Sequence, residues 1–181
     1  TLAALCQHYL GHRFDLLGSG WVTVGHGMAA VGFESHVYKA PQVPTDLTLL
    51  LNPGNRSHAQ KIRAQIAADY VPIDWQIDFK SGYRWQEDHV SSRLQYGHEP
   101  GVDIKVPWEL ARLQHLPQLA VAYAASRMGL EGFETIETYQ AEFQNQVLDF
   151  IAANPPGFGV NWFSGMDVAI RAANLLIAFD L

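Results

Sequence analysis

The sequence has few features that would cross-link it or draw it to a charged polymer. It contains a single cysteine, Cys6, so no disulfide can form within the chain. It has 12 Lys and Arg against 18 Asp and Glu, a net charge of −6, so it has no general basic field for nucleic acid. No apolar run approaches the roughly 20 residues of a membrane span. Disulfide-stabilised scaffolds, nucleic-acid-binding proteins and membrane proteins are therefore disfavoured, and an acidic ligand would have to be met by local arginines.

The composition is that of a folded domain rich in aromatic residues. Hydrophobic residues make up 48% of the 181 residues and charged residues 17%, which is typical of a globular protein with its own core. The chain has five Trp, seven Tyr and nine Phe. Such a content is typical of a dense core or of a cleft that binds carbohydrate. No metal or cofactor site is indicated.

The amino-terminal part, residues 1–104, is rich in Gly, Pro, Asp and aromatic residues. Most of it is expected to form long ordered loops, which are unusual unless they line something. Residues 1–10 are expected to form a helix, and a second helix is expected at 57–70, with Ser57 as its N-cap. Short strands or extended segments are expected at 21–24 and 47–51.

The carboxy-terminal part, residues 105–181, has apolar residues at helical spacing. Pro107 fits the first position of a helix, Pro117 is expected to interrupt or kink that helix, and Thr135 is placed to cap the next one. Short connections between long helices predict antiparallel hairpins. The predicted fold is therefore mainly α, one domain in which a loop-rich region with few short strands precedes the helices.

The last helical segment starts at Ser164 or Gly165 and runs to Leu181 without a stop signal. No Gly, Asn or basic residue closes it. A helix this apolar is normally buried among others. We therefore expect the chain to be an incomplete piece of a longer protein. The alternative is a natural 181-residue protein with a packed terminal helix.

The segment from Pro72 to Trp85 mixes aromatic and charged residues. Its aromatic residues are Trp75, Phe79, Tyr83 and Trp85. Aromatic faces bind the C–H faces of sugar rings, while flanking polar groups hold hydroxyls and charges. The other interpretation is that these side chains only anchor a long loop to the helices.

A second candidate segment begins at Trp108. Trp108, Arg112 and His115 are spaced to share one face of a helix, and Glu109 is close enough to pair with Arg112. An arginine held by a glutamate is suited to clamp a carboxylate or a sulfate. A purely structural ion pair is the alternative.

A third segment spans the start of the last helix. Asn161 and Trp162 precede it, and Asp167, Arg171 and Asn174 form its polar stripe. Such a stripe must face water, a cleft or buried partners. The structural alternatives are an Asp167–Arg171 ion pair and Asn161 as the helix cap.

Four segments occur in one order along nearly the whole chain. They are Phe14–Ser19 (FDLLGS), Asp78–Trp85 (DFKSGYRW), Lys105–Arg112 (KVPWELAR) and Asn161-Trp162 followed by Arg171. In this register they resemble the amino-terminal region of the heparinase II/III-type polysaccharide lyases. Any one segment is a weak signal, whereas four in register are fairly specific to the family. They do not identify the substrate.

The resemblance implies a fold and a location. Members of this family have an incomplete α/α toroid followed by a β-sandwich domain. Residues 1–104 would then be the loop-rich amino-terminal part of the toroid, and residues 105–181 its first helical hairpins. The β-sandwich of the same chain would lie beyond Leu181. A periplasmic or secreted location is expected from the family.

The resemblance also implies a reaction. The family cleaves uronic-acid polysaccharides, such as heparin or heparan-like polymers, by β-elimination, and no cofactor is expected. A neutraliser, often Asn or His, makes C5–H acidic, a Tyr or His removes the proton, and a Tyr protonates the leaving oxygen. Catalytic residues are expected beyond Leu181, so the chain alone should be inactive, with Asn161 as a candidate neutraliser within it. The residues expected to line or support the substrate cleft are Trp108, Glu109, Arg112, Asn161, Trp162 and Arg171.

Two other functions remain open from the sequence. One is a non-catalytic family member that binds glycan in exopolysaccharide handling. The other is a helical-toroid glycoside hydrolase, which needs two carboxylates facing the cleft. Glu109 and Asp167 are its candidates, yet each has an arginine at helical spacing, which favours ion pairs. If the cleft assignment is right, replacing Arg112 or Arg171 by alanine should weaken substrate binding more than stability.

Overall fold

The computed structural model describes residues 1–181 and is mainly helical. The α-helices are α1 (Leu2–Leu10), α2 (Pro53–Arg63), α3 (Lys105–Ala111), α4 (His115–Arg127), α5 (Ile136–Ala153) and α6 (Gly165–Asp180). The 3₁₀ helices are η1 (Leu47–Leu50), η2 (Ser91–Arg93) and η3 (Val160–Trp162). Strands β1 (Arg13–Phe14) and β2 (Val22–Thr23) form one antiparallel sheet. The prediction of a mainly α fold with few short strands is confirmed, but no toroid is seen.

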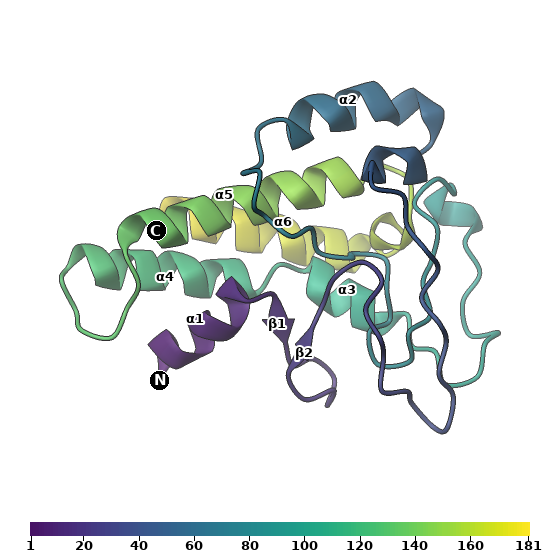
Figure 1. The fold of residues 1–181 in the computed structure, drawn as a ribbon, viewed down its shortest axis with the longest axis horizontal. Helices are drawn as coiled ribbons and strands as arrows, with labels where there is room; N and C mark the ends of the chain where they lie inside the picture. Colours follow the sequence, from purple (N-terminus) through teal and green to yellow (C-terminus); the bar gives the residue numbers. More distant parts are fainter.

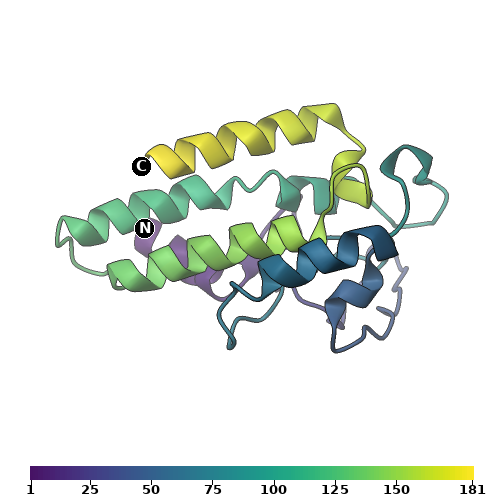
Figure 2. The same ribbon diagram turned by 90° about the horizontal axis from the view of Figure 1, so that it is seen from above.

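The long helices form a layer with α4 at its centre. Helix α4 packs against α5 on one side and α6 on the other, and α2 lies along the outer side of α5 (Figure 2). Helix α1 packs on α4 and leads into the β1–β2 hairpin (Figure 1). The long loops gather at the end of the layer where α3 and η3 lie. The main core is buried between the helices, the hairpin and the loop at 73–79.

The helix predicted at 57–70 begins and ends earlier than expected. Helix α2 starts at Pro53, because Asn52 accepts a hydrogen bond from the backbone N–H of Gly54 at 3.1 Å and acts as the N-cap. A proline in the first turn follows naturally, since its missing N–H would be unpaired there. The prediction of Ser57 as N-cap was therefore wrong. The helix ends at Arg63, and turns replace the predicted last two turns.

The predicted segment at 47–51 is η1 and not a strand. The Asp46 carboxylate accepts from the backbone N–H of Thr48 at 3.0 Å and from its hydroxyl at 2.7 Å. This local side-chain cap favours a tight turn over the extended backbone that the leucine-rich sequence suggested. By contrast, the strand expected at 21–24 is present as β2, which pairs Val22 with Phe14.

The helix expected from Pro107 onward is two helices, α3 and α4. Helix α3 begins two residues before Pro107. The break lies at Leu113, whose φ of +56° no α-helix accommodates. Pro117 sits in the first turn of α4, where a proline is tolerated, so it does not itself cause the break.

The other helix ends agree with the sequence. Thr135 caps α5 through a hydrogen bond from the Thr138 N–H, and Ser164 caps α6 through one from the Asp167 N–H. Gly129 follows α4 with a φ of +70°, as a C-terminal glycine should. The cap at Thr135 and a start of the last helix at Ser164 or Gly165 were expected from the sequence, because these signals are local.

One face of α6 is apolar and uncovered. Its exposed large side chains are Met166, Leu176, Ile177 and Phe179, the last of them 87% exposed. No other element of the structure packs on that face. None of the helices combines the length and the apolar composition that a membrane span requires.

Candidate functional site

The four segments that carry the family resemblance are linked one to the next by hydrogen bonds made in or beside them. The first two are joined by Lys80, whose Nζ donates to the Leu17 carbonyl oxygen at 2.9 Å. The second is joined to the chain just before the third by Asp78, whose Oδ2 accepts from the backbone N–H of Asp103 at 3.0 Å. These segments are far apart in the sequence, and only the fold makes them neighbours.

The third and fourth segments are joined in the same way. Trp108 on α3 donates its indole N–H to the Val160 carbonyl oxygen in η3 at 2.9 Å. Arg171 on α6 donates through Nε to the Ala111 carbonyl oxygen at the end of α3, at 2.5 Å. The six residues that the sequence assigned to a cleft therefore lie on adjoining elements.

Arg112 lies at the centre of an ion cluster on this surface. Its Nε donates to Asp167 Oδ1 at 2.6 Å, and one of its terminal nitrogens donates to Glu109. The Glu109–Arg112 pair predicted from the sequence is thus present. The predicted Asp167–Arg171 pair is not formed, because α6 packs on α3 with Asp167 facing Arg112. Two carboxylates share one guanidinium, and Arg112 has no excess positive charge.

Arg171 is a buried brace. It is 4% exposed, donates to the Ala111 carbonyl oxygen and donates through a terminal nitrogen to the Asn161 carbonyl oxygen at 2.8 Å. Its guanidinium lies over the Phe150 ring at 4.5 Å and near the Trp162 ring at 5.4 Å. Burial lowers the pKa of Arg171 to about 10. The side chain fixes α6 to α3 and η3 and reaches no open surface.

The polar stripe of α6 faces these buried partners. Asn174, one turn beyond Arg171, donates to the Arg112 carbonyl oxygen at 2.8 Å. Of the three environments that the sequence allowed for the stripe, the structure shows the buried one.

Asn161 also braces the site. It is 1% exposed, and its Nδ2 donates to the Trp75 carbonyl oxygen at 2.8 Å and to Asn154 Oδ1 at 2.9 Å. It does not cap α6, because Ser164 does. Trp162 donates its indole N–H to the Asn154 carbonyl oxygen at 2.9 Å and is half-buried. Asn161 thus holds the turn before α6 against the loop at 73–79, and Trp162 holds it against the end of α5.

Three aromatic rings form the part of the site that reaches solvent, and we call them the aromatic platform: Tyr96, Trp108 and Phe163. The Trp108 and Phe163 rings are stacked, with centroids 5.9 Å apart and an interplanar angle of 17°. Tyr96 meets Phe163 edge-on at 5.1 Å and is 51% exposed. Sequence reasoning found Trp108 and missed the other two, although Phe163 directly follows the Asn161-Trp162 pair. A ring surface beside the Glu109–Arg112 pair suits the apolar face and the hydroxyls of a sugar.

The aromatic segment 72–85 is mostly core. Trp75 and Phe79 are buried, with Trp75 packed edge-on against Phe150. Asp74 and Arg84 are also internal, and Arg84 Nε donates to Asp74 Oδ2 at 2.7 Å, whereas Lys80 is partly exposed. For these residues the loop-anchoring interpretation agrees with the structure, and only Tyr83 keeps a partly open ring.

His115 does not share the face of Trp108 and Arg112, which corrects the sequence expectation. The break at Leu113 turns it into the core, where its Nε2 is 2.7 Å from Gln146 Oε1. Burial lowers the pKa of His115 to about 4, although the hydrogen bond to Gln146 opposes this. His115 is therefore neutral at physiological pH and structural.

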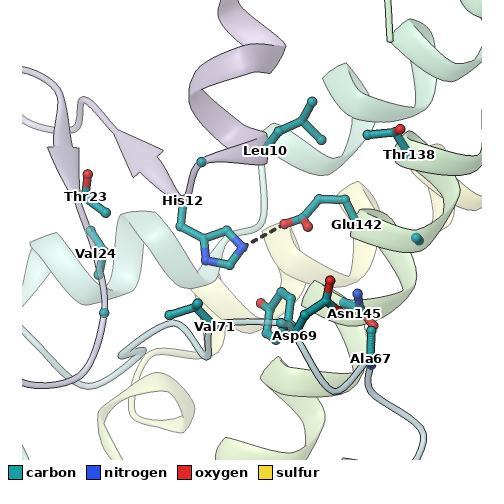
Figure 3. Close-up of a pocket in the computed structure, with 14 residues that line it drawn as sticks. Leu10, His12, Thr23, Val24, Ala67, Asp69, Val71, Thr138, Glu142 and Asn145 are labelled. Carbon is teal, nitrogen blue, oxygen red and sulfur yellow. Dashed lines mark hydrogen bonds and ion pairs between the residues drawn. The ribbon is translucent and has the colours of Figure 1, made fainter. Parts of the chain in front are cut away.

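A separate cavity of about 510 Å³ lies between the end of α1, the loop after α2, and α5 (Figure 3). In it His12 Nε2 is 2.8 Å from Glu142 Oε1, a pairing 130 residues apart that the sequence did not reveal. Imidazole–carboxylate pairs can serve acid–base chemistry. The carboxylates of its lining are Asp69 and Glu142, and no Lys or Arg lines it, so an acidic polymer would be repelled.

The structure contains no group of three or more His, Cys, Asp or Glu side chains placed to hold a metal ion. Comparison of the chain with protein-family models, with curated proteins and with solved structures finds no match.

Proposed function

We propose that this chain is the amino-terminal part of a polysaccharide lyase of the heparinase II/III type, which cleaves uronic-acid polysaccharide by β-elimination. In this proposal the helical layer belongs to a partial α/α toroid. Further helices of that toroid would cover the exposed apolar face of α6. The catalytic acid, base and neutraliser belong to residues outside 1–181.

The observation that carries the proposal is the series of hydrogen bonds that links the four resembling segments one to the next. Four residues of these segments make a hydrogen bond to another segment, or to a residue directly beside one: Lys80, Asp78, Trp108 and Arg171. Chance similarities scattered over a chain have no reason to meet at one place. Their assembly supports the idea that they are parts of one inherited site.

The residues take different roles in this proposal. The aromatic platform and Arg112 are accessible enough to meet a sugar, whereas Asn161 and Arg171 position the elements that carry them. In the elimination, a base takes the C5 proton of a uronate and the C4–O bond breaks. The leaving oxygen gains a proton, and a C4–C5 double bond forms. The platform would hold a sugar next to the bond that breaks.

The alternative of a non-catalytic glycan-binding protein uses the same surface and differs only in the chemistry. The hydrolase alternative is less favoured, because Glu109 and Asp167 both bind Arg112 and Asp167 is 1% exposed. A general acid needs a carboxyl that can protonate and reach the glycosidic oxygen.

The test is a product assay on the full-length protein that contains this chain. It is incubated with heparan-type, alginate-type and glucuronan-type polymers, and the ultraviolet absorbance of unsaturated uronate is followed. We expect absorbance to rise with at least one polymer, and residues 1–181 alone to give none. Binding without any cleavage would favour the glycan-binding alternative. New reducing ends without unsaturation would favour the hydrolase.

A further inference from the structure

A second cavity adjoins the aromatic platform, and we infer that it binds the carboxylate-bearing sugar next to the one on the platform. This cavity, the Arg93 pocket, has a volume of about 310 Å³ and is lined by Tyr83, Trp85, His89, Arg93 and His98 among others. The volume is at the low end of the range for small-molecule sites. The inference rests on the proposed function, because it assigns a place to a unit of the same acidic polysaccharide.

The charges of the Arg93 pocket favour an anion. No Asp or Glu is among its lining residues, although the chain as a whole carries a net charge of −6. Arg93 is exposed and takes part in no ion pair, so its charge is available to a ligand. His89 and His98 add ring nitrogens that donate hydrogen bonds to a carboxylate. Outside the lining, Glu99 Oε1 lies 3.8 Å from His98 Nε2.

The other arginine of the lining does not add a free charge. Arg84 donates to Asp74 at 2.7 Å and also binds Glu87, and all three side chains are buried. These carboxylates raise the pKa of Arg84 in spite of its burial. Arg84 therefore builds the floor of the pocket, and Arg93 is the residue left to recognise an anion.

The wall that carries Arg93 is held in place from both sides. The backbone N–H of Ser91 donates to the Gly157 carbonyl oxygen at 2.9 Å, and the Ser91 hydroxyl donates to the Gly159 carbonyl oxygen at 2.7 Å. On the other side, the Trp85 indole N–H donates to the Gln95 carbonyl oxygen at 3.2 Å. A pocket formed before the ligand arrives loses less conformational entropy on binding.

Residues of the segment 94–98 contribute to both the pocket and the platform. Leu94, Gln95 and His98 line the pocket, whereas Tyr96 belongs to the platform. A small buried cluster of Trp85, Ile104 and Val160 lies beneath both, with Trp108 packed against it. One oligosaccharide could thus lay a ring on the platform and direct the carboxylate of its neighbour toward Arg93. The aromatic residues Tyr83 and Trp85 would give that second ring an apolar wall.

The experiment compares Arg93→Ala with the unchanged protein. The probes are uronate tetrasaccharides from the three polymer types and the same tetrasaccharides with their carboxyl groups reduced, and Kd is measured by calorimetry. Arg93→Ala should raise Kd for the acidic probe at least tenfold, the effect of losing a charged hydrogen bond. It should also remove the preference for the acidic probe over the reduced one. Arg93→Lys, which keeps a point charge, should retain part of that preference.

Arg127→Ala is the matched control, because Arg127 is an exposed arginine at the far end of α4. It should leave Kd unchanged, and both alanine variants should melt like the wild type. An Arg93→Ala protein with wild-type Kd and preference would overturn the pocket inference and leave the proposed function standing. If the unchanged protein bound no acidic probe, the proposed function itself would fail and the pocket inference with it.

Discussion

Replacing Arg171 by alanine is expected to destabilise the protein, because this side chain connects three elements. It donates two hydrogen bonds to carbonyl oxygens, at 2.5 Å from Ala111 and 2.8 Å from Asn161. A hydrogen bond from a charged group contributes about 1.5–3 kcal/mol. The ring contacts at Phe150 and Trp162 add to this stabilisation, whereas the cost of burying the charge offsets part of it. We therefore expect Arg171→Ala to lower the free energy of unfolding by about 4 kcal/mol. For a chain of 181 residues this lowers Tm by about 8–16 °C.

The assay is thermal and urea unfolding, followed by circular dichroism and tryptophan fluorescence. Arg171→Lys is the informative companion, because an ammonium group keeps the charge but cannot reach two carbonyl groups in the planar geometry of guanidinium. Its loss of stability should lie between those of the wild type and the alanine variant. The reasoning is refuted if Arg171→Ala melts within about 2 °C of wild type while glycan binding is lost. That result would restore the expectation from sequence that Arg171 acts on the substrate.

Two further predictions concern the pH dependence of stability, which involves His115 and Asp149, and the cost of adding a side chain at Gly159. Folding lowers the pKa of His115 to about 4 and raises that of Asp149 to about 6, in both cases because of burial. As pH falls from 6.5 to 4, His115 therefore removes about 3 kcal/mol of stability and Asp149 restores a similar amount. The free energy of unfolding of His115→Gln should therefore rise on acidification from its value at pH 6.5, and that of Asp149→Asn should fall. Urea unfolding at each pH measures both, and equal slopes of the free energy of unfolding against pH in the two variants would contradict the assignment. Separately, Gly159→Ala should cost about 2–4 kcal/mol, because at a φ of +69° its Cβ would lie 2.7 Å from the Gln76 side chain. Gly157→Ala is the control, since it has a φ of +80° and open space, and should cost only about 1–2 kcal/mol. Equal costs in the two glycine variants would show that the contact with Gln76 is unimportant.

Sequence reasoning worked best where a signal is local. The cap at Thr135 and the start of the last helix at Ser164 or Gly165 are decided within a few residues, and both were located correctly. It failed where two local signals competed. At α2 the Asn52-Pro53 start prevailed over a capping pattern at Ser57, and at η1 a side-chain cap prevailed over a strand-like run of leucines.

The candidate site was only partly visible in the sequence. The spacing of Glu109 and Arg112 predicted their ion pair, since both lie on one helix turn. The same rule predicted a pair between Asp167 and Arg171 that does not form. Helical spacing cannot show that another helix presents Arg112 to Asp167. Tyr96, Phe163 and the Arg93 pocket were missed because their parts are not periodic.

The sequence by itself determined the helical class, the starts of α5 and α6, the absence of internal disulfides and the order of the four resembling segments. These properties follow from composition, caps and spacing along one segment of chain. The tertiary structure alone decided which polar groups became braces and which stayed accessible. Asn161 and Arg171 are buried by the docking of α6 on α3, whereas Arg93 is left without a partner on a loop wall. The reason is physical: burial and charge pairing depend on which distant elements meet, and that information lies in the packing of the whole chain.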